Sequence, residues 1–140
     1  MYLLGLTGSV GMGKTTAADV FRCYGAAVYD ADATVHQLMR SGGRASELVR
    51  RAFPNVFRNN IIDRKALGSI VYNDKNALAE LEAILHPLVQ EVQAEFLRQC
   101  AKSRKKLVVL SVDFKTITLK VAFARLWNCV QGLKGLVECL

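Results

Sequence analysis

The chain has 140 residues, of which 51% are hydrophobic and 22% are charged, and its 19 lysines and arginines outnumber its 12 aspartates and glutamates. This length suffices for one domain with a core, and the composition excludes a disordered or low-complexity chain. The net charge of +7 favours anionic partners, although an ordinary solvated surface carries such a charge equally well.

The cysteines and the start of the chain indicate the compartment. Cys23, Cys100, Cys129 and Cys139 form no C-x-x-C pair and have no histidine at the spacing of a metal site. The residues after Met1 lack the basic region of a secretory signal. No apolar run reaches the roughly 18 residues of a membrane-spanning helix. We therefore expect a cytoplasmic protein with reduced thiols and no membrane partner.

The first forty residues alternate between strand and helix patterns. Residues 2–7 are a short apolar run that fits a buried parallel strand, and a glycine-rich loop separates them from a helical pattern over residues 14–24. Residues 26–29 predict a second strand, and residues 33–40 predict a second helix. This order predicts an α/β fold with a parallel sheet.

Helical patterns follow the second helix. Residues 44–57 contain an amphipathic stretch that ends at Pro54, and Asn59-Asn60 predicts a turn. Asp63 is the expected N-cap of a short helix that ends at Val71.

The longest helical pattern runs from residue 75 to about residue 103. Pro87 lies inside it and predicts either a kink or a join between two helices, because proline donates no backbone hydrogen bond. Residues 106–112 are apolar and predict a third buried strand, and the pattern after residue 113 favours no structure.

Residues 8–15 read Gly-Ser-Val-Gly-Met-Gly-Lys-Thr and match the phosphate-loop pattern G-x-x-x-x-G-K-S/T in full. In this pattern the glycines let backbone N–H groups approach phosphate oxygens, and the following helix directs its positive end at the same anion. Lys14 would offset charge on the β- and γ-phosphates, and the Thr15 hydroxyl would bind Mg²⁺. The alternative is an ordinary glycine-rich turn, and the loop alone does not specify a reaction.

Two acids follow the second predicted strand, in the sequence Asp30-Ala31-Asp32. Ligands of open α/β sheets bind beyond the carboxyl ends of the strands. A carboxylate at this position can accept the proton of a hydroxyl that attacks a γ-phosphate. Alternatively, Asp32 only caps the helix predicted to begin at Ala33.

Four segments together resemble dephospho-CoA kinases: residues 5–16, 30–38, 63–71 and 81–90, in this order, within a resemblance that covers residues 1 to about 110. That family transfers the γ-phosphate of ATP to the 3′-hydroxyl of dephospho-CoA, the last step of coenzyme A synthesis. The resemblance implies a P-loop NTPase-like three-layer α/β fold, truncated, with a helical substrate-side subdomain over residues 44–100. It also implies a small-molecule partner, dephospho-CoA, and no nucleic acid, and it leaves the oligomeric state open.

The resemblance implies roles for individual residues. Asp32 would be the catalytic base, with Asp30 the less certain of the two acids, and Lys14 would act on the transferred phosphate. His36, Arg64, Lys65 and His86 would lie on the substrate side, although a solvated surface for Arg64 and Lys65 and a plain helix position for His86 stay open. ATP and Mg²⁺ would be held by Gly8, Ser9, Val10, Gly11, Met12, Gly13, Lys14, Thr15 and Thr16.

Residues 111–140 depart from the family. Where the family continues with D-x-P-L-L-F-E, residues 110–115 read Leu-Ser-Val-Asp-Phe-Lys, and no arginine-rich lid follows. We expect a single P-loop kinase domain over residues 1–140 with an atypical tail from residue 111, produced by a frameshift or an altered gene end. A non-catalytic nucleotide-binding remnant and another small P-loop metabolite kinase are the alternatives. A nucleic-acid-binding protein is the fourth possibility, and no recognition motif supports it.

Overall fold

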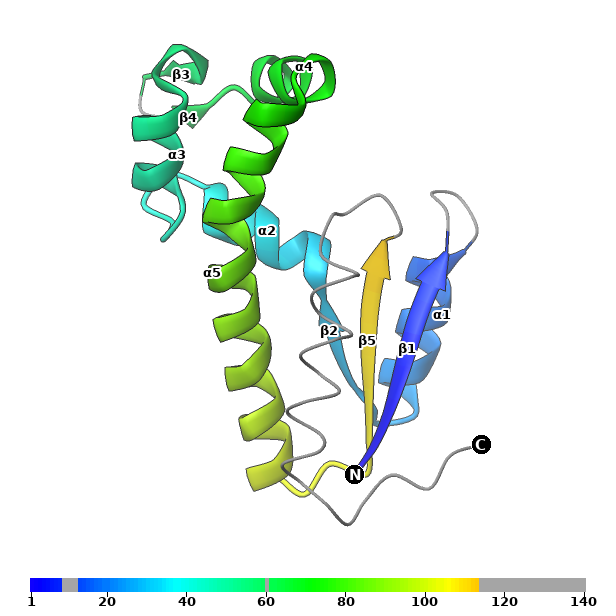
Figure 1. Ribbon diagram of the computed structural model, residues 1–140. Helices are drawn as coiled ribbons and strands as arrows, with labels where there is room; N and C mark the ends of the chain where they lie inside the picture. Colours follow the sequence, from blue (N-terminus) through cyan, green and yellow to red (C-terminus); the bar gives the residue numbers. More distant parts are fainter. Residues whose placement is uncertain (9–12, 60, 114–140) are drawn as a thin grey trace. The chain divides into compact units, whose positions relative to one another are not determined.

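The computed structural model describes residues 1–8, 13–59 and 61–113 (Figure 1). The chain divides into two compact units. Among the described residues, the first unit contains those of the range 1–32 together with Gln93–Asp113, and the second contains those of Ala33–Val92. The first unit holds the parallel sheet, and the second consists mainly of helices.

Three parallel strands form the sheet: β1 (Tyr2–Gly8), β2 (Ala27–Asp30) and β5 (Leu107–Asp113), in the order β1-β5-β2. In the register, Val109 of β5 lies opposite Leu4 on one side and Val28 on the other. Because β5 has a strand on each side, its apolar residues are well covered, and Val108 and Val109 are 0% exposed. The predicted α/β fold with a parallel sheet is confirmed.

β1 is one of the two outer strands of this sheet among the described residues, and its apolar side chains are less covered than those of the central strand β5. Tyr2 is 68% exposed and Leu4 is 39% exposed. Both strands have the apolar sequence of a buried strand, so their different burial comes from their positions in the sheet.

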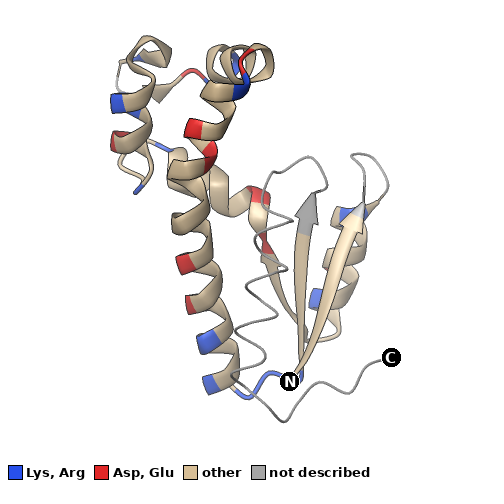
Figure 2. Ribbon diagram, in the orientation of Figure 1, with Lys and Arg blue, Asp and Glu red and all other residues tan. Residues whose placement is uncertain are grey.

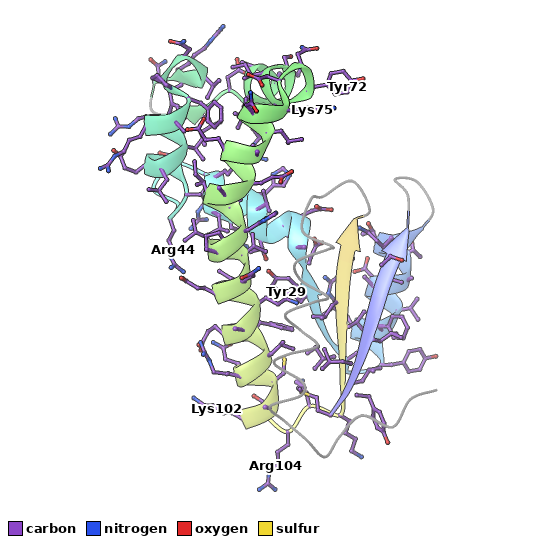
Figure 3. The ribbon with its side chains drawn as sticks, in the orientation of Figure 1. Tyr29, Arg44, Tyr72, Lys75, Lys102 and Arg104 are labelled. Carbon is purple, nitrogen blue, oxygen red and sulfur yellow. The ribbon has the colours of Figure 1, made fainter. Side chains whose placement is uncertain are left out.

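Helix α1 (Lys14–Cys23) follows β1 and contacts all three strands. It ends one residue before the predicted end, and the N–H of Gly25 donates to the carbonyl of Arg22 at 2.9 Å. Gly25 has φ +83°, the left-handed conformation in which a glycine commonly ends a helix. In the same unit, Tyr29 of β2 lies with its ring centroid 5.5 Å from that of Phe96, on helix α5 (Lys75–Lys102) (Figure 3).

Helix α2 (Ala31–Met39) begins directly after β2, two residues before the predicted start. The alternative interpretation of Asp32 placed it ahead of the helix as a cap, whereas Asp32 lies within the first turn. An acidic residue in the first turn is favourable because it faces the positive end of the helix dipole. The strand and the helix therefore meet without a connecting loop.

The second unit surrounds an apolar core. After α2 it contains α3 (Ser46–Ala52), the 3₁₀ turn η1 (Pro54–Val56), the strands β3 (Phe57–Arg58) and β4 (Ile61–Ile62), α4 (Arg64–Asn73) and the first part of α5. Fully burying one such aliphatic side chain contributes roughly 1.5–3 kcal/mol. The buried residues of this core are Leu38, Ala45, Val49, Phe53, Val56, Ile62, Leu67, Ala77, Leu81 and Val89.

Asp63 caps α4, as predicted from the sequence. Its carboxylate accepts hydrogen bonds from the backbone N–H groups of Lys65 and Ala66, each at 3.1 Å. The antiparallel pair β3 and β4 just before it was not predicted beyond the turn at Asn59-Asn60, because strands of two residues leave no alternation to detect.

Helix α5 runs through Pro87 as one element, so of the two alternatives for Pro87, a kink or a join between two helices, the join is wrong. Apolar residues before and after the proline in the sequence pack in the second unit. Val89 is buried in its core, and Leu85 and Leu88 pack against that core. In the described ranges, no helix is both long enough and apolar enough to cross a bilayer.

Candidate active site

The two ends of the phosphate loop are placed by regular structure. Gly8 is the last residue of β1, and Gly13 directly precedes α1. Gly13 has φ +78°, a left-handed conformation that is strained for residues with a side chain, and its carbonyl accepts from the N–H of Ala17 at 2.9 Å. Ser9, Val10, Gly11 and Met12 lie outside the described residues. The strand-to-helix context that the motif requires is therefore present.

Lys14 and Asp32 form an ion pair in the first unit. The Lys14 Nζ lies 3.8 Å from the Asp32 Oδ2, and the side chains are 15% and 37% exposed. β1 and β2 are both parallel to β5, so they end at the same edge of the sheet. The helices that follow them therefore begin at that edge, which brings Lys14 of α1 close to Asp32 of α2. Figure 2 shows acidic residues in red where β2 passes into α2.

Oxygen donors lie close to this ion pair in the sequence. Thr15 and Thr16 are in the first turn of α1, and Asp30 ends β2. Hydroxyl and carboxylate oxygens are the ligands that Mg²⁺ prefers. The described residues contain no group of three or more histidines, cysteines or acids able to hold a metal by themselves. This donor set fits Mg²⁺, which ordinarily takes one or two protein ligands together with water and substrate phosphates.

A second group of predicted residues meets in the second unit, where α2 and α4 bring His36 and Arg64 into contact although they are 28 residues apart. The Arg64 Nη1 touches the imidazole of His36, and the Arg64 Nη2 donates to the backbone carbonyl of His36 at 3.2 Å. Lys65 follows on the exposed start of α4. A further cation near the start of α4 is Arg58, whose Nε lies 3.7 Å from the Oδ2 of Asp63, the cap of that helix. The sequence analysis did not single out Arg58.

His86 lies in α5, one residue before Pro87, and belongs to the second unit. Its Nε2 is buried and has no hydrogen-bond partner among the described residues. A buried polar atom without a partner is uncommon and requires an explanation. The sequence located this histidine but gave no signal of its burial.

The resolved pKa shifts lie outside these residues. The hydrogen bond from Arg98 lowers the pKa of Glu95, and burial raises the pKa of the Cys100 thiol. Cys100 lies in the second half of α5 and is buried, so it acts as a small apolar side chain of the first unit.

Comparison with known proteins identifies relatives of the whole described region. The family model for dephospho-CoA kinase matches residues 2–116, a few residues beyond the expected end of the resemblance. The dephospho-CoA kinase of Paramagnetospirillum magneticum is 52% identical over 112 residues, which are 80% of this chain and 53% of the relative. That of Rhodospirillum rubrum is 54% identical over 111 residues, 79% of this chain and 53% of the relative. The chain spans about half the length of the curated relatives it matches.

Solved structures agree with the fold. The crystal structure of TT1252 from Thermus thermophilus has a TM-score of 0.69 and 31% identity, and the match covers 91% of this chain and 60% of that one. Dephospho-CoA kinase from Campylobacter jejuni has a TM-score of 0.63 and 23% identity, over 94% of this chain and 82% of that one. At that identity the second match supports the fold alone.

Proposed function

Since the chain belongs to the dephospho-CoA kinase family, we propose that it transfers the γ-phosphate of ATP to the 3′-hydroxyl of dephospho-CoA. The observation that carries the proposal is the proximity of Lys14 and Asp32, 3.8 Å apart at the carboxyl edge of the sheet. Phosphoryl transfer requires a cation at the phosphate and an acceptor for the hydroxyl proton at the same place.

In the reaction, the 3′-oxygen attacks the γ-phosphorus in line with the leaving group, and the bond from that phosphorus to the β–γ bridging oxygen breaks. The hydroxyl proton moves to the carboxylate of Asp32, and ADP leaves with the bridging oxygen. Lys14 turns from Asp32 toward the β- and γ-phosphates and offsets the negative charge there. Residues 8–16 hold the phosphates through backbone N–H groups and the start of α1.

Mg²⁺ fits the donor set at this edge. Thr15 would hold it, with phosphate oxygens and water as the other ligands. When bound, the ion supplies positive charge at the β- and γ-phosphates.

We assign the substrate side to the second unit. The contact between His36 and Arg64 and the cation of Lys65 at the start of α4 support binding of the phosphate groups of dephospho-CoA. His86, whose buried Nε2 has no partner among the described residues, is proposed to bind the same substrate. The whole chain would then be one cytoplasmic kinase domain that acts on a small molecule and not on nucleic acid.

The test is ADP release by the purified chain with Mg-ATP, with and without dephospho-CoA. We expect release that depends on dephospho-CoA and falls by about 100-fold or more in Lys14→Ala and in Asp32→Asn. Lys102→Ala, at the exposed end of α5, is the matched control and should retain full release. A panel of other nucleotide and metabolite acceptors separates this function from another P-loop kinase.

A second candidate function, nucleotide binding without transfer, rests on the phosphate-loop pattern, which binds phosphates without specifying a reaction. Binding of a fluorescent ATP analogue, measured on the same preparations, tells the two apart. Tight binding with no ADP release that depends on dephospho-CoA, in a chain shown to be folded, would support the second candidate and contradict the first.

A further inference from the structure

The second unit contains a cavity of about 300 Å³ that the proposed function does not use. The side chains that line it are Ser41, Ser46, Glu47, Arg50 and Phe57, and the backbone of the adjoining glycine pair completes the wall. Its volume is at the lower end of the roughly 300–1,000 Å³ of small-molecule sites. None of these residues belongs to the candidate active site.

The glycine pair, Gly42-Gly43, gives this cavity a fixed wall. Gly42 has φ +76°, and a Cβ on Gly43 would lie 2.2 Å from the carbonyl oxygen of Leu38, so only glycine fits there. The N–H of Gly43 donates to the carbonyl of Arg40 at 2.8 Å, and the N–H of Ala45 donates to that of Leu38 at 3.0 Å. The loop is thus held by backbone hydrogen bonds, and no side chain at the glycine positions fills the cavity.

The stretch of chain that supplies the cavity lining is basic through arginine alone, although Glu91 pairs with Arg44 and Asp63 pairs with Arg58. Residues 33–62 contain five arginines, no lysine and one acid, Glu47. All five belong to exposed residues. Arginine presents a planar fork that binds phosphate oxygens in pairs, which lysine does not. The five are Arg40, Arg44, Arg50, Arg51 and Arg58.

Glu47 is paired with the guanidinium that lines the cavity. Its Oε2 lies 2.6 Å from the Arg50 Nη2, and its Oε1 lies 3.3 Å from the Arg51 Nε. The hydrogen bond from Arg50 lowers the pKa of Glu47, so this carboxyl stays ionised at neutral pH. Exposed ion pairs of this kind contribute little to stability, so Arg50 can exchange Glu47 for another anion while Arg51 continues to neutralise the carboxylate.

We propose that this cavity binds a small phosphate monoester, with the phosphoryl group on Arg50 and the organic part against Phe57. The hydroxyls of Ser41 and Ser46 are suitable donors for the remaining phosphate oxygens. The site is built from residues of the second unit alone, and its ligand is not the transferred phosphate.

The test is a titration of the chain with phenyl phosphate, followed by ¹H–¹⁵N NMR of the backbone amides. We expect saturable shifts at Gly42 and Gly43, with weaker binding of inorganic phosphate, which lacks the organic part. Arg50→Gln should weaken binding by about tenfold or more, the usual effect of a charged hydrogen bond. Glu47→Gln should tighten it about threefold, because it removes the competing carboxylate.

Asp19→Asn is the matched control, because Asp19 is paired with Arg22 at the same i,i+3 spacing on α1, away from the cavity residues in the sequence. It should leave the affinity unchanged. Shifts confined to Gly13 and Lys14, or equal shifts with sodium chloride at the same ionic strength, would overturn the proposal. Weaker binding in Glu47→Gln would do so too. Random single-stranded DNA that shifts Gly42 and Gly43 at a lower concentration would replace it with a nucleic-acid surface.

Discussion

Helices α1 and α4 are each ten residues long and each begin with a cation, yet their first turns are built differently. The residue before α4 is Asp63, whose carboxylate accepts hydrogen bonds from two of the first backbone N–H groups. The residue before α1 is Gly13, which has no side chain that could accept such bonds. N–H groups at a helix start that no side chain caps can bind another acceptor, and a phosphate is a suitable one. Under the proposed function, the cap of α4 serves stability and the start of α1 binds the nucleotide phosphates.

The largest expected effect comes from giving α1 an acid where α4 has one. Gly13→Asp places a carboxylate beside the nucleotide phosphates, and like charges brought together cost several kcal/mol. We expect affinity for a fluorescent ATP analogue to fall by about 100-fold or more. Gly13→Asn, equal in size and uncharged, should lose much less. Equal losses in both variants would assign the effect to backbone strain at φ +78° and break the comparison.

A moderate effect is expected from removing the cap of α4. Asp63→Ala should lower the free energy of unfolding by about 1 kcal/mol, because two N–H groups lose their acceptor. Urea unfolding followed by circular dichroism measures this loss. The amide oxygen of an asparagine side chain also accepts such hydrogen bonds, so Asp63→Asn should retain most of the stability. Nucleotide affinity should stay the same in both variants, and a parallel fall in affinity would contradict the separation of roles.

The smallest expected effect is a change in the hydrogen-exchange rates of backbone amides. Mg-ATP should slow exchange of the amides in the first turn of α1 severalfold, because phosphate oxygens accept their hydrogen bonds. The amides of the first turn of α4 should not respond, since Asp63 already binds them. Equal slowing at both helices would indicate general stabilisation by the ligand rather than direct contact.

Local features of this chain were predictable from the sequence. The phosphate loop needs glycines and a lysine at fixed positions, and Asp63 precedes its helix in the pattern of a cap, so each is encoded within a few residues. The parallel sheet followed from the order of strand and helix patterns. The match of the family model to residues 2–116 supports the identification made from four short segments.

Features that depend on distant residues were not predictable in the same way. The contact of His36 with Arg64 joins two helices, and no local pattern encodes it. The continuity of α5 through Pro87 depends on packing around Val89, which outweighs the proline's local preference. The roles of the predicted substrate-side residues stay predictions until the substrate experiments are done.

The uncovered apolar side chains of β1 have a practical consequence. Tyr2 and Leu4 lie on a seven-residue strand that, among the described residues, is hydrogen-bonded along one side only. An apolar strand edge that is left unpaired is a template for another strand, and a charged residue in place of Leu4 makes such an edge a poorer template.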